Sequence, residues 1–132
     1  MQNFEQLGKD VREFKRLETF PRPDSVREVR CISDEVSAVC PITSQPDWYT
    51  VEIVYAPSDR CLESKSLKLY LNTFRNKGVF CESLASEILG EIVRALEPVR
   101  CEVIVRQKSR GGISIVATAS AGNGPMNGEG GV

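Results

Sequence analysis

The alternation of hydrophobic and polar positions predicts two strands in the first half of the chain. Residues Val29 to Val39 are compatible with a strand, and alternation between Trp48 and Tyr55 places four large side chains on one face. These four are Tyr49, Val51, Ile53 and Tyr55. The segment CPITSQPD, positions 40 to 47, joins the two strands.

The middle of the chain repeats its apolar residues every three or four positions, which is the period of an amphipathic helix. The first stripe stops at Asn76-Lys77-Gly78 and comprises Leu67, Tyr70, Leu71 and Phe74. The second stops at Pro98 and comprises Leu84, Ile88, Ile92 and Leu96. Two helices are therefore predicted, each with a single apolar face to bury.

Alternation returns on both sides of the turn KSRGG, positions 108 to 112. This pattern predicts a hairpin whose alternating residues are Cys101, Val103, Val105, Ile113, Ile115 and Ala117. The element order is then β-β-α-α-β-β. It favours an α+β fold with a four-stranded, mostly antiparallel sheet and both helices on one face.

The chain of 132 residues fits one compact domain. We expect the domain to span residues 28–119. Residues 1–27 are predicted to be an N-terminal arm that packs against it, and residues 120–132 a flexible, glycine-rich tail.

The overall charge narrows the range of partners. A net charge of −1 gives no general basic field, so neither nucleic acid nor an anionic membrane is expected as the main partner. No apolar run approaches the roughly 20 residues of a membrane span, and the charged start differs from a signal peptide. Five cysteines without a C-x-x-C pair indicate reduced thiols, and the absence of histidine makes a metal site unexpected. These features predict a cytoplasmic protein.

Several residues have two possible interpretations on the basis of chemistry alone. Cys40 could be a buried thiol at a strand end or a nucleophile, and Asp47 could be a turn residue or its proton partner. Lys65 and Lys68 could lie on a solvated helix face. Glu82 suits the start of a helix, and Arg110 begins a glycine turn that could also approach a phosphate.

Five segments together resemble one family. They are CPITSQPD at 40 to 47, ESKSLKLY at 63 to 70, FRNKG at 74 to 78, Glu82, and RGGIS at 110 to 114. Their order and spacing are similar to those of the QueF family, the NADPH-dependent nitrile reductases of tRNA queuosine biosynthesis. The resemblance implies a tunnelling fold that assembles into an oligomeric barrel, with two stacked pentamers and active sites between subunits.

The resemblance also implies a reaction and a role for each motif. The nitrile of 7-cyano-7-deazaguanine would be reduced to the aminomethyl group through a covalent thioimide on Cys40, with Asp47 as acid and two NADPH per nitrile. A free aspartate is ionised at neutral pH, so this role requires a site that keeps Asp47 protonated. The expected substrate-binding residues are Leu62, Glu63, Ser64, Cys81 and Glu82. The expected cofactor-binding residues are Ser64, Lys65, Lys68, Arg110 and Gly111.

Two positions depart from the family pattern. Cys81 stands where the family usually has histidine, so proton donation assigned to that histidine would fall to water, Cys81 or Asp47. Ser44 stands where glycine is common, and serine is accepted in many turns.

Two other functions compete with reduction. One is the related archaeosine-forming amidinotransferase, which would use the same Cys40 and Asp47 on a nitrile already in tRNA. The other is a catalytically inactive binding protein on the same fold. The motif at 63 to 70 favours reduction, and the weak net charge argues against tRNA.

Overall fold

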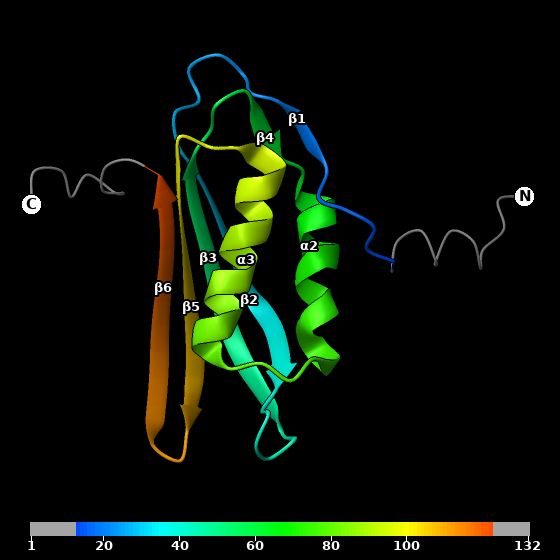
Figure 1. Ribbon diagram of the computed structural model, residues 1–132, viewed down its shortest axis with the longest axis vertical. Helices are drawn as coiled ribbons and strands as arrows, with labels where there is room; N and C mark the ends of the chain where they lie inside the picture. The colour runs from blue at the N-terminus through cyan, green and yellow to red at the C-terminus, as the bar shows by residue number, and fades with distance from the viewer. Residues whose placement is uncertain (1–12, 123–132) are drawn as a thin grey trace, which may run out of the picture.

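The computed structural model describes residues 13–122 (Figure 1). The first 12 residues of the predicted arm and residues 123–132 of the predicted tail lie outside this range. In chain order the elements are β1 (Thr19–Pro21), β2 (Val29–Val39), β3 (Pro46–Ala56), β4 (Arg60–Leu62), α2 (Ser64–Asn72), the 3-10 helix η1 (Thr73–Asn76), α3 (Cys81–Leu96), β5 (Arg100–Arg110) and β6 (Ile113–Gly122).

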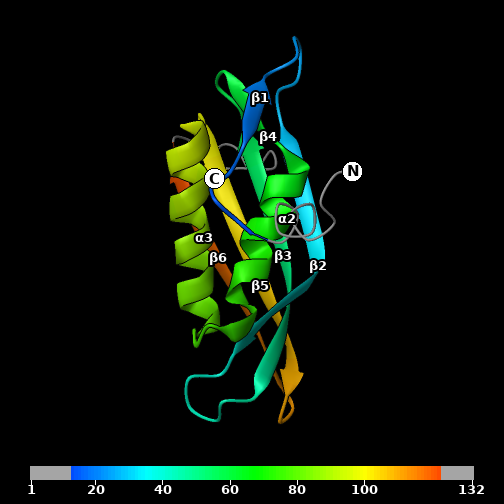
Figure 2. The same ribbon diagram turned by 90° about the vertical axis from the view of Figure 1, so that its right-hand side faces the viewer.

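The four long strands form one antiparallel sheet in the order β2-β3-β5-β6. Helices α2 and α3 lie side by side on the same face of this sheet, and both views show the other face uncovered (Figures 1 and 2). The predicted α+β architecture is confirmed. Strands β2–β3 and β5–β6 are hairpins, and the long-range antiparallel pairing of β3 with β5 joins them into one sheet.

The core lies between the sheet and the two helices, where the predicted apolar positions meet. The inward face of β3 carries Tyr49, Val51, Ile53 and Tyr55, and each of them is at most 1% exposed. The predicted stripes of both helices are buried against this face. The residues predicted by strand alternation and those predicted by helical periodicity therefore pack against each other in one core.

The structure adds a small second sheet that the pattern did not predict. Strand β1 pairs antiparallel with β4, and the Arg60 side chain donates hydrogen bonds to the carbonyl and hydroxyl oxygens of Thr19. The described part of the arm therefore packs on the domain through backbone pairing. Three residues are too few to give an alternation signal, which explains why these strands were missed.

Two boundaries also differ from the prediction. Helix α2 ends at Asn72, and the chain continues as a 3-10 turn in which the Thr73 hydroxyl donates to the Tyr70 carbonyl at 2.6 Å. Strand β6 runs to Gly122, so the first three residues assigned to the tail pair with β5. Among the described helices, no segment is long and apolar enough to cross a membrane.

Candidate active site

Cys40 occupies the first position of the loop that joins β2 to β3. Its N–H donates to the Gln45 carbonyl at 2.8 Å, and its own carbonyl accepts from the Ser44 N–H at 2.9 Å. Ser44 adopts a positive φ of 64°, a conformation that favours glycine. Serine was expected to fit this turn without difficulty, but the backbone of Ser44 lies in the left-handed region. The two backbone bonds hold Cys40 at the end of the sheet.

The surroundings of Cys40 favour its thiolate. Hydrogen bonds from the hydroxyl and N–H of Thr43, from the Arg110 guanidinium and from the Ile42 N–H lower the pKa of Cys40 to about 6. The Thr43 hydroxyl makes the largest contribution. The thiolate is the nucleophilic form of cysteine, so this lowered pKa favours the nucleophilic form of Cys40 at neutral pH.

Asp47 lies on β3, on the strand face that is covered by the helices, and it is buried. Arg110 forms an ion pair with it, with 2.9 Å between Nη1 and Oδ1. The turn after Arg110 is made by Gly111 and Gly112, whose φ angles are 63° and 82°. This turn brings Arg110 to Cys40 and Asp47. The predicted cofactor-binding arginine therefore contacts both predicted catalytic residues.

Helix α3 begins beside Cys40. The N–H of Val39 donates to the Lys77 carbonyl at 2.9 Å, and the N–H of Val79 donates to the Val39 carbonyl at 3.1 Å. These bonds tie the segment before α3 to the residue that precedes Cys40. They bring the expected substrate-binding residues Cys81 and Glu82 to the same end of the sheet.

Cys81 and Glu82 differ in exposure. Cys81 is 1% exposed, and its thiol lies 3.6 Å from the Val105 carbonyl, to which it donates. Burial and then the charge of Glu82 raise the pKa of Cys81, so it stays a thiol. Glu82 is exposed in the first turn of α3, where a carboxylate is favourable for the helix dipole.

The remaining predicted residues lie at the opposite end of α2. Leu62 ends β4, and its N–H donates to the Tyr55 hydroxyl at 2.9 Å. Glu63 caps α2, because its carboxylate accepts from the N–H groups of Lys65 and Ser66, both at 2.8 Å. The N–H groups of Ser66 and then of Lys65 lower the pKa of Glu63. These contacts fix the segment that leads into α2.

The two groups of predicted residues do not meet within one chain. Helix α2 and the 3-10 turn separate them by about 20 Å, and Figures 1 and 2 show the start of α2 and the start of α3 at opposite ends. Ser64 and Lys68 line a groove of about 420 Å³ between α2 and β2, and Cys40 does not line it. Lys65 is exposed nearby. The predicted site residues thus form two separate groups in one chain.

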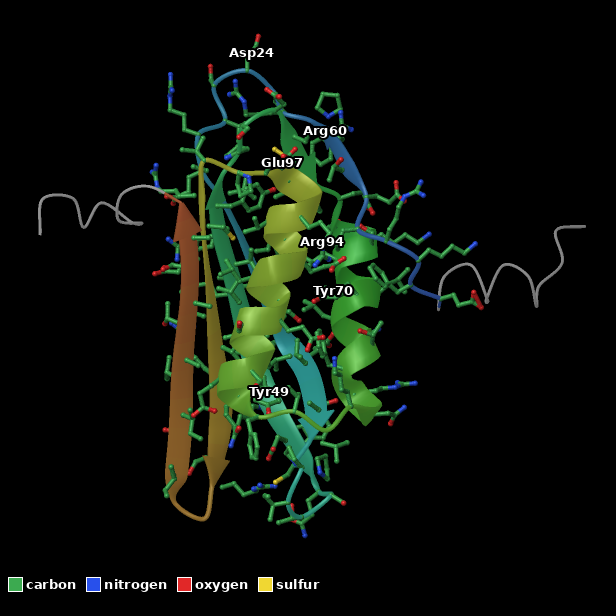
Figure 3. The ribbon with its side chains drawn as sticks, in the orientation of Figure 1. Asp24, Tyr49, Arg60, Tyr70, Arg94 and Glu97 are labelled. Carbon is green, nitrogen blue, oxygen red and sulfur yellow. The ribbon has the colours of Figure 1, made fainter. Side chains whose placement is uncertain are left out.

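Sequence reasoning missed two residues at the Cys40 end. Thr43 lies inside the recognised motif, but its hydrogen bond to Cys40 depends on the closed loop. Tyr49 was assigned to the core; it lies near the beginning of α3 (Figure 3), and its buried hydroxyl has no hydrogen-bond partner among the described residues. The spacing of Tyr49 from Asp47, two positions on one strand face, was the available signal.

Metal ligands do not gather in the described part of the chain: residues 13–122 contain no group of three or more Cys, Asp or Glu side chains that could hold an ion. All five cysteines are free thiols. At the Cys40 end the structure brings together one thiol, one carboxylate and one guanidinium.

Comparisons with known proteins identify the family of the chain. The family described as QueF-like protein matches residues 46–125. A protein from Frankia casuarinae is 49% identical over 106 residues, 80% of this chain and 85% of that protein. One from Syntrophus aciditrophicus is 44% identical over 115 residues, 86% of this chain and 82% of that protein. Both are named NADPH-dependent 7-cyano-7-deazaguanine reductase.

A solved structure shares the fold. It is the crystal structure of the archaeosine synthase QueF-Like in the apo form, with a TM-score of 0.72 and 25% sequence identity. The likeness covers 77% of this chain and all of that one.

Proposed function

The chain belongs to the family of QueF-like proteins, and on this basis we propose that it reduces the nitrile of 7-cyano-7-deazaguanine to an aminomethyl group with NADPH. Relatives at 44% and 49% identity have that activity in their names. The observation that carries the proposal is Cys40, whose lowered pKa makes it a thiolate beside the buried Asp47. The product would enter queuosine biosynthesis, and a cytoplasmic location stays a prediction from the sequence.

The first step would be covalent. The thiolate of Cys40 attacks the electrophilic nitrile carbon and forms a thioimide, while the nitrile nitrogen takes a proton. We assign this proton to Asp47, which would have to carry it when the attack takes place. Because Cys40 is already a thiolate, the proton that Asp47 passes to nitrogen is replaced from solvent.

The exposed lysines of α2 fit the ribose phosphate of NADPH by charge and position. Lys65 and Lys68 are both exposed on this helix, and Ser64 precedes them. The first N–H groups of α2 are not available to a phosphate, because Glu63 occupies them. We assign phosphate binding to Lys65 and Lys68, with Gly111 of a neighbouring copy as a close backbone approach, since Gly111 lies at the Cys40 end of its own chain. NADPH, when bound, supplies hydride, and two are needed to convert a nitrile to an amine.

We propose that a second copy of the chain completes each site. The expected substrate-binding segment at 62–64 is too far from Cys40 of the same chain. It would therefore contact the Cys40 end of a neighbouring chain. The uncovered sheet face, with exposed Ile32, Trp48 and Val116, and the free edges of β2 and β6 would be covered by assembly. Two stacked pentamers are the expected form. A light-scattering mass equal to one chain would contradict this assembly.

The amidinotransferase is the second candidate, since the solved neighbour is an archaeosine synthase. Its identity of 25% is well below the 44% and 49% of the two reductases, which favours reduction. Cys40 and Asp47 suit both reactions. A catalytically inactive protein is disfavoured by the lowered pKa of Cys40.

The deciding experiment is NADPH oxidation by the purified protein with 7-cyano-7-deazaguanine, with Cys40→Ala as the matched variant. Two NADPH per nitrile, lost in the variant, would support the reductase. A mass adduct at Cys40 without NADPH oxidation would favour the transferase. Absence of both would favour the inactive binding protein.

A further inference from the structure

Tyr49 has a buried hydroxyl without a hydrogen-bond partner among residues 13–122. Its side chain is 0% exposed. Tyr55 lies on the same face of the same strand and is equally buried, but its hydroxyl accepts from the Leu62 N–H. A buried hydroxyl without a partner is disfavoured, and such groups are rare in folded proteins. We therefore looked to a bound ligand as the hydrogen-bond acceptor for the Tyr49 hydroxyl.

The hydroxyl lies in the catalytic end of the molecule. Tyr49 follows Asp47 by two positions on one face of β3 and pairs with Gln107 of β5. Cys81 donates to Val105, which is two residues from Gln107 on the same strand. Figure 3 shows Tyr49 at the end of α3 where this helix begins. Tyr49 thus belongs to the same region as the nucleophile and its acid.

The environment keeps this hydroxyl protonated. Burial raises the pKa of Tyr49, and the charges of Asp47, Cys81 and Cys40 raise it further. A phenol that holds its proton so firmly acts as a hydrogen-bond donor instead of an acid.

We propose that the Tyr49 hydroxyl is a catalytic hydrogen-bond donor to the nitrogen of the reacting group, first in the nitrile and then in the imine. This role rests on the proposed reductase function. The imine is the critical stage, because its carbon no longer has a bond to Cys40 and only non-covalent contacts hold it. The chain has no histidine, and the Cys81 thiol, a weak donor, is already directed at Val105. Tyr49 is the buried hydroxyl at this end for which residues 13–122 provide no hydrogen-bond partner.

Tyr49 transfers no proton in this role. Tyr49 keeps its proton, while Asp47 and solvent supply the protons that nitrogen gains. The donor stabilises the negative charge that develops on nitrogen as carbon is attacked, and it orients the imine for the second hydride.

The test is Tyr49→Phe, which removes one oxygen and keeps the ring in the core. We expect the kcat for NADPH oxidation to fall about tenfold to a hundredfold, with a smaller change in the KM for the nitrile. The pH dependence of Cys40 alkylation should be unchanged, since Thr43 and Arg110 set it. Thermal unfolding should show a variant at least as stable as the parent, because an unsatisfied hydroxyl is removed.

Tyr70→Phe is the matched control. It removes the same atom from another buried tyrosine, on α2, whose charged neighbours are Glu87, Glu91 and Arg94. We expect kcat to stay within twofold of the parent. A Tyr49→Phe kcat within twofold of the parent overturns the proposal and leaves the reductase intact. A loss of activity matched by a loss of stability assigns Tyr49 a structural role and also overturns it. A parent protein that does not oxidise NADPH overturns the reductase itself.

Discussion

The guanidinium of Arg110 contacts the buried carboxylate of Asp47, with 2.9 Å between the two groups, and it also donates to the sulfur of Cys40. One cation thus serves both the nucleophile and the group that we assign as its acid. This relationship links the tip of the β5–β6 hairpin to the loop between β2 and β3, two segments far apart in the sequence.

Removing this cation should make Cys40 less acidic. In Arg110→Gln the thiolate loses a hydrogen bond and a positive charge, so the pKa of Cys40 should rise above about 6. The rate of iodoacetamide alkylation, measured against pH, should shift its midpoint upward. The midpoint should stay below that of an ordinary thiol, because the larger contribution of Thr43 remains.

Arg106→Gln is the matched control for that experiment. Arg106 lies on the same strand and pairs with Glu52 at 3.1 Å, on the uncovered face of the sheet. It should leave the alkylation midpoint of Cys40 unchanged. An equal shift in both variants would show that general charge, and not the contact of Arg110, sets the acidity of Cys40.

Alkylation at neutral pH should be selective for one cysteine. Cys40, with a pKa of about 6, is mostly thiolate at pH 7, and its reaction should slow as the pH falls below 6. Burial raises the pKa of Cys31, Cys81 and Cys101, which stay protonated. Peptide mapping after a short reaction should find about one label per chain, on Cys40. Equal labelling of Cys81 would contradict this assignment.

Replacing Ser44 by glycine should stabilise the protein. The φ of 64° costs a residue with a side chain about 1 kcal/mol that glycine does not pay, so urea unfolding of Ser44→Gly should have a higher midpoint. Ser25→Gly is the control, since Ser25 has a φ of 75° in a loop away from Cys40. Both variants should gain stability. A gain in only the Ser25 variant would mean that Ser44 is stabilised by its loop contacts.

Tyr55→Phe should behave in the opposite way to Tyr49→Phe. Its hydroxyl accepts from the buried N–H of Leu62, and the loss would leave that N–H unsatisfied. We expect the free energy of unfolding to fall by about 1–3 kcal/mol, measured by urea unfolding. A variant as stable as the parent would show that Leu62 finds another acceptor.

Local patterns were sufficient to predict the fold class and the family. The alternation around Val51 and the stripe through Ile88 define the core, and both depend only on nearby residues. Five segments together, with the one around Cys40 and Asp47 among them, indicated the family by their order and spacing. The pairing of Cys40 with Asp47 at one end of the sheet could be expected, because a short loop separates them.

Features that depend on strand register and helix ends could not be predicted. Arg110 reaches Asp47 only because the β5–β6 hairpin ends level with the loop of Cys40. Whether the Tyr49 hydroxyl has a hydrogen-bond partner depends on the residues that tertiary packing brings near it. Ser64 is far from Cys40 because α2 begins at one end of the sheet and runs toward the other end, where Cys40 lies (Figure 1). Such relationships come from tertiary packing, on which sequence periodicity gives no information.

The length of α2 predicts how two inactive variants would behave when they assemble together. Because α2 and the 3-10 turn separate the start of α2 from the end of the sheet that carries Cys40, each complete site would combine the Cys40 end of one chain with the Glu63 end of another (Figure 1). Cys40→Ala and Glu63→Ala chains would each be inactive alone. Unfolded together and refolded as mixed assemblies, they should recover part of the activity, since some interfaces would join two intact halves. In a cell that makes both chains, two defective copies would complement each other.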